Sequence, residues 1–223
     1  MTENVIELLV IRHGETAWNA ERRLQGHVDI PLNATGMQQA RALAARLCNE
    51  PIDAILCSDL QRAMQTAAAI AEQKSLPVQI NPAWRERNFG GFEGELINTL
   101  EQRYPVEYAA WRAHEVDNAF PTNRQGIASG ESIRQFHTRI ETALQELSHQ
   151  YANKKIVVVA HGGVLECLYR IAHQMPLSAP RQVSMLNASL NRFELNASQN
   201  NINLKLIQWG DVAHLDVTLD ELM

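Results

Sequence analysis

Cysteine is scarce in this chain. The 223 residues include only Cys48, Cys57 and Cys167, and no two of them form a C-x-x-C pair. An odd number of cysteines without that spacing argues against a disulfide framework and against a cysteine-based zinc site. A reducing compartment fits this usage best, so the sequence predicts a cytoplasmic protein.

An excess of basic charge is also missing. Lys and Arg number 20 against 25 Asp and Glu, which gives a formal net charge of -5 and a pI of about 5.9. Because the basic residues are scattered, the sequence favours neither a nucleic-acid partner nor an anionic membrane surface. Any anion site must be local, and the expected partner is a small molecule.

Long apolar runs are absent as well. No segment approaches the roughly 18 apolar residues of a membrane-spanning helix, and the residues before Arg12 lack the basic and apolar regions of a secretory signal. Neither secretion nor membrane insertion is expected. The sequence also has no internal repeat, and its length predicts a single domain, residues 1–223.

What is present alternates between two periodicities. Short apolar, often β-branched runs, typical of strands buried on both faces, are each followed by a segment with an apolar helical stripe. These runs are residues 6–11, 52–56 and 156–160. Alternating segments at 190–195 and 204–209 predict a hairpin, and the irregular stretch 95–130 predicts a cap-like insertion containing short helices.

This alternation predicts an α/β fold with a doubly wound, mostly parallel sheet and helices on both faces, in three layers. Such sheets bind ligands beyond the carboxyl ends of their strands. Polar clusters stand at three of those ends, Arg12 to Gly14, Ser58 to Arg62 and His161 to Gly163. We therefore expect the clusters to form one pocket.

The residue types in these clusters suit a phosphate ester. Phosphoryl transfer needs fixed donors around the equatorial oxygens and an in-line nucleophile. Arg12 and Arg62 offer guanidinium groups that bind phosphate bidentately, and Arg62 is expected in a first helical turn, where free N–H groups also favour an anion. The glycines after His161 let backbone amides approach a ligand.

The same clusters contain candidate nucleophiles. A histidine attacks phosphorus only through an unprotonated nitrogen, and its unperturbed pKa of about 6.5 leaves much of it neutral near pH 7. Either His13 or His161 fits, since flanking arginines depress the pKa further. Glu86, in a glycine-rich loop with aromatic neighbours, is the candidate acid that protonates the leaving alkoxide and later deprotonates water.

Four stretches carry these residues in a fixed order: LVIRHGETAWN at 9–19, SDLQRAMQTA at 58–67, ERNFGGFEG at 86–94 and AHGG at 160–163. Together they resemble the motifs of the histidine phosphatase superfamily, in its phosphoglycerate mutase-like branch. The similarity spans nearly the whole chain. The arginine-histidine-glycine tripeptide alone would be a weak signal, but four motifs in the family order make coincidence improbable.

The resemblance implies a role for each matched position. His13 is the implied nucleophile and Glu86 the implied proton donor. The positions implied to bind substrate or phosphate are Arg12, Asn19, Gln25, Gly26, Arg62, Glu86, His161 and Gly162. The implied chemistry requires neither a metal nor a cofactor.

The family divides into phosphatases and cofactor-dependent phosphoglycerate mutases. Mutases usually carry a longer basic insertion after the glutamate loop, whereas 95–130 is short here and has only Arg103, Arg112 and Arg124 as cations. The Gly-Glu-Ser sequence at 130–132 also resembles that of the small phosphatases of the family. We therefore expect a phosphomonoester hydrolase that acts on a small phosphorylated metabolite through a phosphohistidine, with the mutase as the alternative.

Simpler interpretations of single residues stay open at this stage. Glu86 could be a surface carboxylate paired with Arg85 and Arg87, and Arg62 could pair with Asp59 at i,i+3. The remaining histidines are expected to be structural or solvent-facing. They are His27, His114, His137, His149, His173 and His214.

Two other functions also stay open. His13, His161 and Glu86 could form a three-ligand zinc site, although two arginines would oppose a dication. A non-catalytic phosphate-binding protein would not require nucleophile, acid and pocket together. The sequence leaves the oligomeric state undecided, and a homo-oligomer is compatible with it.

Overall fold

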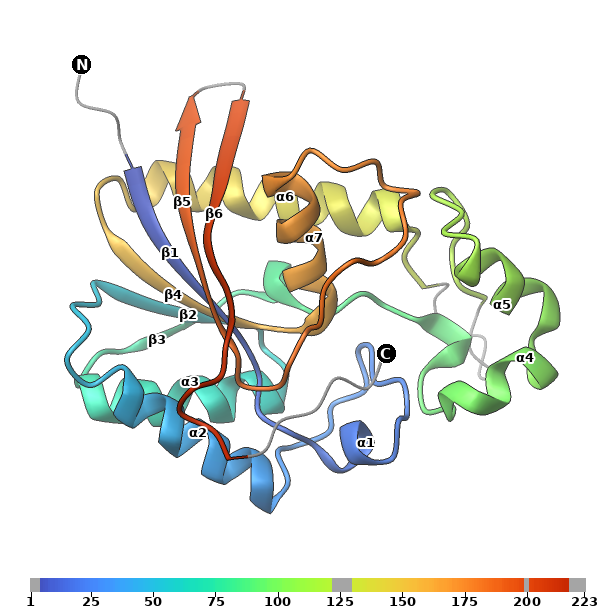
Figure 1. Ribbon diagram of the computed structural model, residues 1–223, viewed down its shortest axis with the longest axis horizontal. Coiled ribbons are helices and arrows are strands. Elements are labelled where there is room, and N and C mark those ends of the chain that lie inside the picture. The colour runs from blue at the N-terminus through green and yellow to red at the C-terminus, as the bar shows by residue number, and fades with distance from the viewer. Residues whose placement is uncertain (1–4, 122–129, 199–200, 217–223) are drawn as a thin grey trace.

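A six-stranded mixed sheet forms the centre of the computed structural model, which describes residues 5–121, 130–198 and 201–216 (Figure 1). The strands are β1 (Val5–Arg12), β2 (Ala54–Cys57), β3 (Val78–Ile80), β4 (Lys155–Ala160), β5 (Leu190–Ser198) and β6 (Asn201–Asp211). Their spatial order is β3-β2-β4-β1-β5-β6. The first four are parallel, and β5 and β6 join antiparallel as the expected hairpin. The doubly wound, mostly parallel sheet is confirmed.

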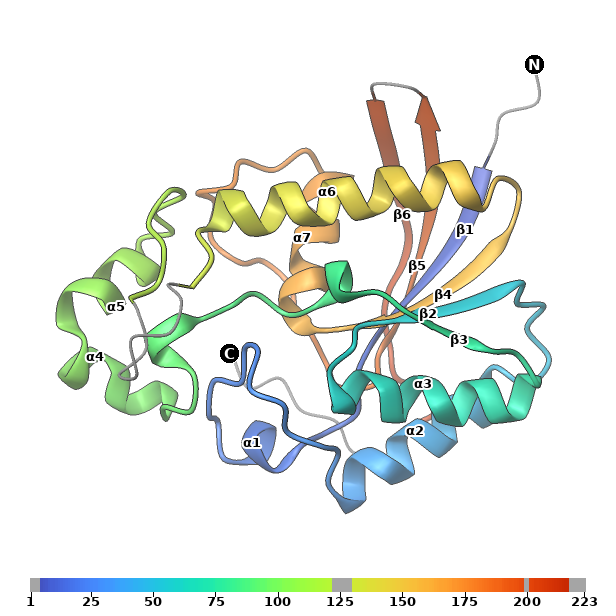
Figure 2. The ribbon, with the colours of Figure 1, turned by 180° about the vertical axis from the view of Figure 1, so that it is seen from behind.

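Helices cover both faces of this sheet. Helices α2 (Ala34–Arg46) and α3 (Gln61–Lys74) lie on one side of the strands, and α6 (Ile133–Gln150) lies on the other (Figure 2). Helix α7 (Gly162–Ala172) shares the core of α6. Successive residues of β1 face opposite layers, because Leu8 packs with α6 and α7 whereas Leu9 packs with α2 and α3. The three-layer prediction is confirmed.

One strand has no counterpart in the sequence prediction. Strand β3 contains three residues, of which Gln79 and Ile80 are exposed. It lies at the edge of the sheet, so it needs no apolar run of the kind that marks β1, β2 and β4. The other strands lie within a few residues of their expected places.

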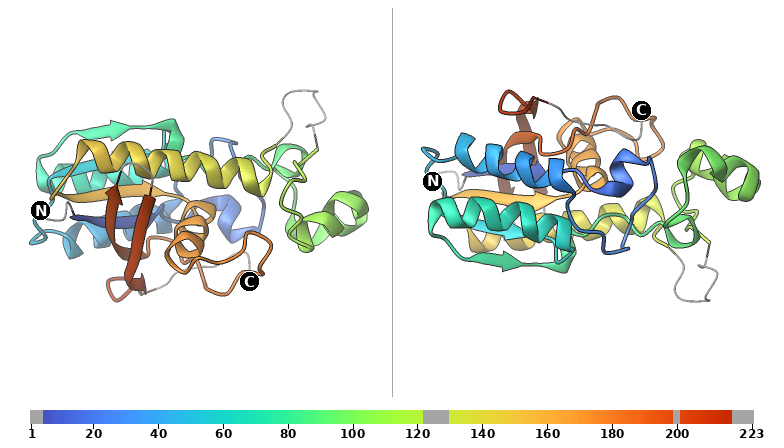
Figure 3. Two further views of the ribbon diagram at one scale, coloured as in Figure 1. Left: turned by 90° about the horizontal axis from the view of Figure 1, so that it is seen from above. Right: turned by 90° about the horizontal axis from the view of Figure 1, so that it is seen from below.

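The residues between η1 (Pro82–Trp84) and α6 form a small body with its own apolar core. It contains the 3-10 helices η2 (Gly90–Phe92) and η3 (Ile97–Thr99), and the helices α4 (Leu100–Arg103) and α5 (Pro105–Arg112), whereas Trp84 of η1 is buried in the same core as α6. A cluster including Phe89, Phe92 and Phe120 forms its core, with Phe92 and Phe120 ring centroids 5.1 Å apart. Helices α4 and α5 stand clear of the sheet in both views of Figure 3. Residues 122–129 of the expected insertion, Arg124 among them, lie outside the described residues.

None of the helices in the described ranges combines the length and apolarity that a membrane crossing requires.

Helix α6 begins at a capping box, in which Ser132 accepts from the backbone of Gln135 and the Gln135 side chain accepts from the backbone of Ser132. This cap fixes the start of the helix at Ile133, two residues after Glu131.

A charged cluster ties the loop before β2 to the sheet. The Glu50 carboxylate accepts from Arg192 at 2.9 and 3.2 Å and from Lys155 at 2.6 Å. The Arg192 hydrogen bonds, followed by those of Lys155, lower the pKa of Glu50 to about 2 against the opposing effect of burial. Glu50 therefore stabilises the fold fully above its unfolded pKa of about 4.5, and this contribution is lost as pH falls toward 2.

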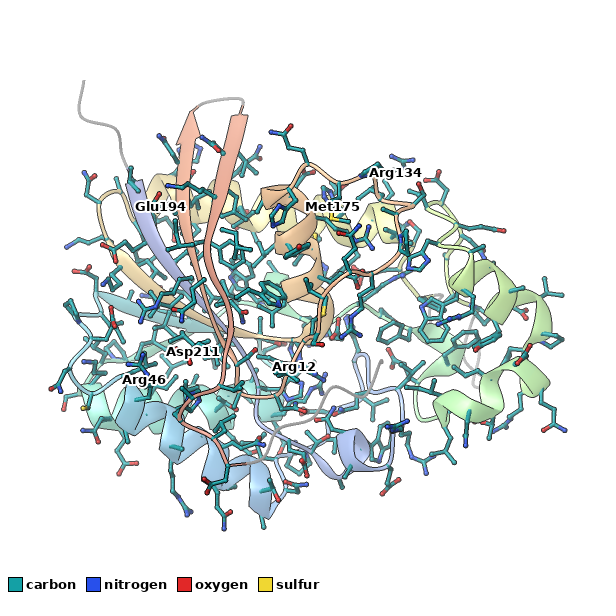
Figure 4. All side chains as sticks on the ribbon, viewed as in Figure 1. Arg12, Arg46, Arg134, Met175, Glu194 and Asp211 are labelled. Atoms are coloured by element: carbon teal, nitrogen blue, oxygen red, sulfur yellow. The ribbon has the colours of Figure 1, made fainter. Side chains whose placement is uncertain are left out.

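We expect Glu50→Gln to lower the free energy of unfolding by about 1 to 2 kcal/mol at pH 7, because the cluster is partly exposed and screened. Urea denaturation at several pH values checks this, and the difference from the parent should shrink as pH falls toward 2. Glu194→Gln is the matched control, since Glu194 pairs with Lys205 on an exposed part of the hairpin (Figure 4). Equal effects of both substitutions would contradict the assignment.

Candidate active site

Four buried side chains converge at the carboxyl ends of β1 and β4. Arg12 is the last residue of β1 and His13 follows it; Arg62 lies in the first turn of α3, and His161 is the N-cap of α7. All four are between 0 and 3 % exposed. The ring centroids of His13 and His161 are 5.1 Å apart. The pocket expected from the strand ends is therefore present, and Arg12 lies near the centre of the molecule below α7 (Figure 4).

His13 is fixed in one tautomer. Its Nδ1 lies 2.7 Å from the carbonyl oxygen of Gly14, which only accepts, so Nδ1 carries the hydrogen and Nε2 has a free lone pair. Burial, followed by the charges of Arg62 and Arg12, holds the pKa of His13 well below its ordinary value. His13 is therefore neutral near pH 7, with Nε2 able to attack an electrophile.

His161 is completely buried, yet neither ring nitrogen makes a hydrogen bond within the described part of the chain. Burial lowers its pKa first, and the charge of Arg62 and the nearby His13 lower it further. A neutral imidazole retains one N–H donor. Because unpaired buried polar atoms are costly, this ring is suited to donate to a bound oxygen.

Arg62 is held in place by backbone carbonyls. Its Nη1 donates to Val28 at 3.0 Å and its Nη2 to Gly26 at 2.8 Å, while Nε has no partner among the described residues. Burial lowers its pKa to about 10, so it stays charged near pH 7. Asp59 instead accepts from Arg85 at 2.5 and 2.7 Å, so pairing of Arg62 with Asp59 is wrong.

Glu86 belongs to the same pocket through α7. Its Oε2 accepts from the backbone N–H of Gly163 at 3.0 Å and its Oε1 from that of Arg87 at 2.7 Å. Burial raises the pKa of Glu86, although both hydrogen bonds and the charges of Arg62 and Arg12 oppose the rise. A carboxyl group whose pKa is raised by burial is suited to donate a proton.

Glu86 is not a surface carboxylate paired with Arg85 and Arg87. The Arg85 guanidinium is engaged with Asp59, and the Arg87 guanidinium donates to the carbonyl of Glu131 and lies 4.4 Å from the centroid of the Phe120 ring. Neither guanidinium forms an ion pair with Glu86 in the described residues. The Glu86 carboxyl group faces the pocket.

A cleft of about 460 Å³ opens over these residues and is lined by Arg12, His13, Gln25, Gly26, Arg62 and Glu86, together with residues of the small body. His161 is not among the lining residues, although its ring lies beside that of His13. Gly162 is adjacent to Arg12, since a Cβ added to Gly162 would lie 3.6 Å from the guanidinium carbon.

Asn19 is placed differently from the other predicted contacts. It is buried, and its side-chain oxygen accepts from the backbone N–H and the hydroxyl of Thr16 in the capping box of α1 (Ala17–Ala20). It is not among the residues that line the cleft. A contact between Asn19 and phosphate stays a prediction.

The cleft is much more cationic than the net charge of the chain. Eight arginines line it against the three glutamates Glu21, Glu86 and Glu166. The arginines are Arg12, Arg22, Arg23, Arg62, Arg87, Arg112, Arg170 and Arg181. Six of these are not among the site residues predicted from the sequence, in which Arg87 and Arg112 are notable only for other reasons. The cleft is therefore suited to anionic ligands.

Two histidines expected to be structural or solvent-facing, His114 and His137, also line the cleft. The aromatic residues Tyr108 and Trp111 of α5 line it as well. His27 has a structural contact, because its Nε2 lies 2.8 Å from the carbonyl oxygen of Glu86. In the described residues, no three His, Cys, Asp or Glu side chains are grouped as ligands for a metal ion.

Known proteins share this sequence pattern and fold. The family model of the histidine phosphatase superfamily, branch 1, matches residues 8–207. Phosphoglycerate mutase-like protein 4 of Arabidopsis thaliana is 39 % identical over 214 residues, covering 95 % of this chain and 88 % of the relative.

Solved structures agree with this match. A putative alpha-ribazole-5'-P phosphatase from Escherichia coli has 33 % identity and a TM-score of 0.74, covering 91 % of this chain and 96 % of that structure. Phosphoserine phosphatase from Entamoeba histolytica, in complex with 3-phosphoglyceric acid, has 27 % identity and a TM-score of 0.75, covering 94 % and 98 %. The family match over most of the length and the shared fold lead to one conclusion: this chain is an enzyme belonging to branch 1 of the histidine phosphatase superfamily.

Proposed function

We propose that this enzyme hydrolyses small phosphomonoesters through a phosphohistidine on His13. The observation that carries the proposal is the tautomer of His13, whose Nδ1 hydrogen bond to Gly14 leaves the Nε2 lone pair directed away from it. The ring of His161 and the charges of Arg12 and Arg62 lie close to this ring, and we expect these three side chains to supply donors for the equatorial oxygens of a phosphoryl group.

The first step forms the bond between Nε2 of His13 and phosphorus and breaks the bond between phosphorus and the ester oxygen. The bonding electron pair leaves with that oxygen, which takes a proton from Glu86. Because burial raises the pKa of Glu86, a protonated carboxyl group is available for this transfer. The alcohol can then leave the site.

In the second step, water attacks the phosphorus of phosphohistidine. Glu86, now ionised, accepts a proton from the water, and the electron pair of the P–N bond returns to Nε2 of His13. Phosphate and the starting protonation state result. The low pKa of His13 favours this step, because the neutral ring is the form released.

A mutase would return the phosphoryl group to an acceptor acid in place of water. The name of the Arabidopsis relative favours that alternative, and the names of the two solved structures favour a phosphatase. We favour hydrolysis because the insertion after the glutamate loop is short. The arginines lining the cleft further suit a small metabolite that carries negative charge.

A panel of phosphomonoesters, assayed by phosphate release with and without 2,3-bisphosphoglycerate and 3-phosphoglycerate, tests this function. We expect hydrolysis of several esters and no transfer between hydroxyl groups of phosphoglycerate. Activity should survive a chelator, whereas loss on chelation that added metal restores would favour a metal hydrolase. Dominant mutase turnover, or phosphate binding without any turnover, would overturn the proposal.

We also propose that residues 1–223 form one domain, with 95–130 as a cap over the cleft. That segment lines the cleft with Ile97, Tyr108, Trp111 and Arg112, which supports a role in substrate choice.

We also propose a cytoplasmic location, which the three free cysteine thiols support.

Gly163 offers a test of the Glu86 geometry. A Cβ added to Gly163 would lie 2.1 Å from Oε1 of Glu86, so Gly163→Ala must displace the carboxyl group. We expect kcat/KM for alkyl phosphates to fall by about 10- to 100-fold, as a misplaced catalytic group would cause. Steady-state kinetics check this, and Gly162→Ala should cost less because its Cβ meets only ordinary contacts. An unchanged Gly163→Ala enzyme would contradict the proposed role of Glu86.

A further inference from the structure

The segment that presents Glu86 has no regular secondary structure of its own. It connects η1 to η2, and the residues from Arg85 to Phe89 belong to no helix or strand. A catalytic carboxyl group on such a segment needs support from elsewhere, because misplacement by about 1 Å is enough to slow a reaction 100-fold. The support comes from residues on and before α6.

Arg139 of α6 donates hydrogen bonds to the backbone of this segment. Its Nη1 donates to the carbonyls of Ala83 at 2.8 Å and Arg85 at 3.0 Å, and its Nη2 donates to the carbonyl of Glu86 at 3.1 Å. These three carbonyls therefore share one guanidinium group. The carbonyl of Glu86 also accepts from Nε2 of His27 at 2.8 Å.

Glu131 completes the arrangement. Its carboxylate accepts from Nε and Nη2 of Arg139, both at 2.8 Å, so all five N–H donors of Arg139 are used. The same carboxylate accepts from the backbone of Asn88 at 2.9 Å, and the Glu131 carbonyl accepts from Nε of Arg87 at 3.0 Å. Arg139 thus holds the segment before Glu86, and Glu131 holds the segment after it.

We propose that Arg139 and Glu131 are positioning residues, which fix the backbone around Glu86 so that its carboxyl group meets the leaving oxygen. This inference rests on the proposed function, in which Glu86 is the acid. Neither residue is among the described residues that line the cleft, so both act through the segment they hold and not on substrate. A lysine can replace Arg139 only in part, because an ammonium group has three donors and lacks the planar fork.

The test compares Arg139→Gln, Arg139→Lys and Glu131→Gln with the parent enzyme. The kcat/KM of alkyl phosphates is expected to fall by about 10- to 100-fold in Arg139→Gln, while that of p-nitrophenyl phosphate, whose leaving group needs no acid, changes by less than about 3-fold. Arg139→Lys and Glu131→Gln should show the same selectivity with smaller losses. The inhibition constant of inorganic phosphate should stay within about 3-fold of the parent, since the phosphate pocket is untouched.

Arg134→Gln is the matched control. Arg134 lies on the same helix and pairs with Asp117, with both side chains mostly exposed and outside the cleft lining (Figure 4). We expect both esters to react at the parent rate in this variant. A leaving-group-dependent loss there would mean that any disturbed ion pair of α6 has this effect, which would overturn the proposal.

Glu86→Gln separates failure of this inference from failure of the proposed function. If Glu86→Gln slows alkyl phosphates selectively and Arg139→Gln does not, only the positioning role is wrong. If Glu86→Gln itself shows no selectivity, Glu86 is not the acid and both fail. Adding Arg139→Gln to Glu86→Gln should cause no further selective loss. Equal loss for both esters, or unfolding of Arg139→Gln, Arg139→Lys and Glu131→Gln alike, would assign Arg139 and Glu131 a purely structural role and overturn the proposal.

Discussion

Replacement of His13 by alanine is expected to reduce turnover of every phosphomonoester by about 10⁴-fold or more, the scale seen when a covalent nucleophile is removed. The nucleophile is the Nε2 lone pair of this ring, which the hydrogen bond from Nδ1 to Gly14 leaves free to attack phosphorus. Steady-state phosphate release measures the loss. The effect should be the same for good and poor leaving groups, because no covalent step remains in either case.

The fold should survive this substitution. The segment at His13 is held through its backbone, where its carbonyl accepts from Asn187 and Ala188, both at 3.2 Å, and its N–H donates to Ala160 at 3.0 Å. The thermal midpoint and near-ultraviolet circular dichroism of the variant test this. Loss of folding would leave the kinetic result ambiguous, so His13→Asn and His13→Gln serve as further variants.

Trapping the phosphohistidine intermediate tests the role of His13 directly. Rapid quenching of the parent enzyme with a ³²P-labelled substrate should trap an acid-labile, base-stable adduct on His13. The His13→Ala enzyme should yield none. Residual turnover near the parent rate, or an adduct elsewhere in the chain, would remove His13 from the mechanism.

Glu86→Gln is expected to lower kcat/KM by about 10² to 10⁴-fold for alkyl phosphates and far less for p-nitrophenyl phosphate. Glutamine keeps the shape of the side chain but cannot transfer a proton to the leaving oxygen. A plot of log kcat/KM against leaving-group pKa measures this, and it should be steeper for the variant. Parallel lines for the two enzymes would contradict general acid catalysis by Glu86.

The pH profile carries the same information. Burial raises the pKa of Glu86, and the protonated form is the acid, so kcat/KM should fall as pH rises through that pKa. Burial and the two arginines lower the pKa of His13, so activity should fall on the acid side only below the ordinary pKa of histidine. Glu86→Gln should lose the alkaline limb for an alkyl phosphate, whose leaving group needs the acid, and keep the acid limb. Retention of both limbs would assign the alkaline limb to another group.

Much of the fold follows from local sequence. The apolar runs of β1, β2 and β4 are long enough, and buried enough on both faces, to be recognised without a partner. The helical stripes that follow them then require a parallel sheet with helices on both faces. Strand β3 was not recognised, because an exposed edge strand of three residues gains its identity from pairing with β2.

The central pocket was also accessible from sequence, since strand ends in such a sheet meet at one edge. Arg12 ends a strand, His13 and His161 follow strands directly, and Arg62 lies in the first turn of the helix after β2. The structure brings all four together. The resemblance to known motifs supplied their roles. Asn19 is not among the residues that line the cleft, and its side chain makes a capping contact that residue type alone does not reveal.

The sequence by itself determined the layered fold and pointed to the group around His13, because strand ends in such a sheet meet at one edge, while the motif resemblance pointed to Glu86. Only the tertiary structure decided the arginine lining of the cleft and the grip of Arg139 and Glu131 on the Glu86 segment. The hydrogen bonds from Arg139 and Glu131 to this segment join residues 43 to 56 positions apart, and the arginines of the cleft come from more widely scattered segments. A guanidinium group has five donors and many carbonyls within a folded chain to choose from, and packing alone selects which of them it meets.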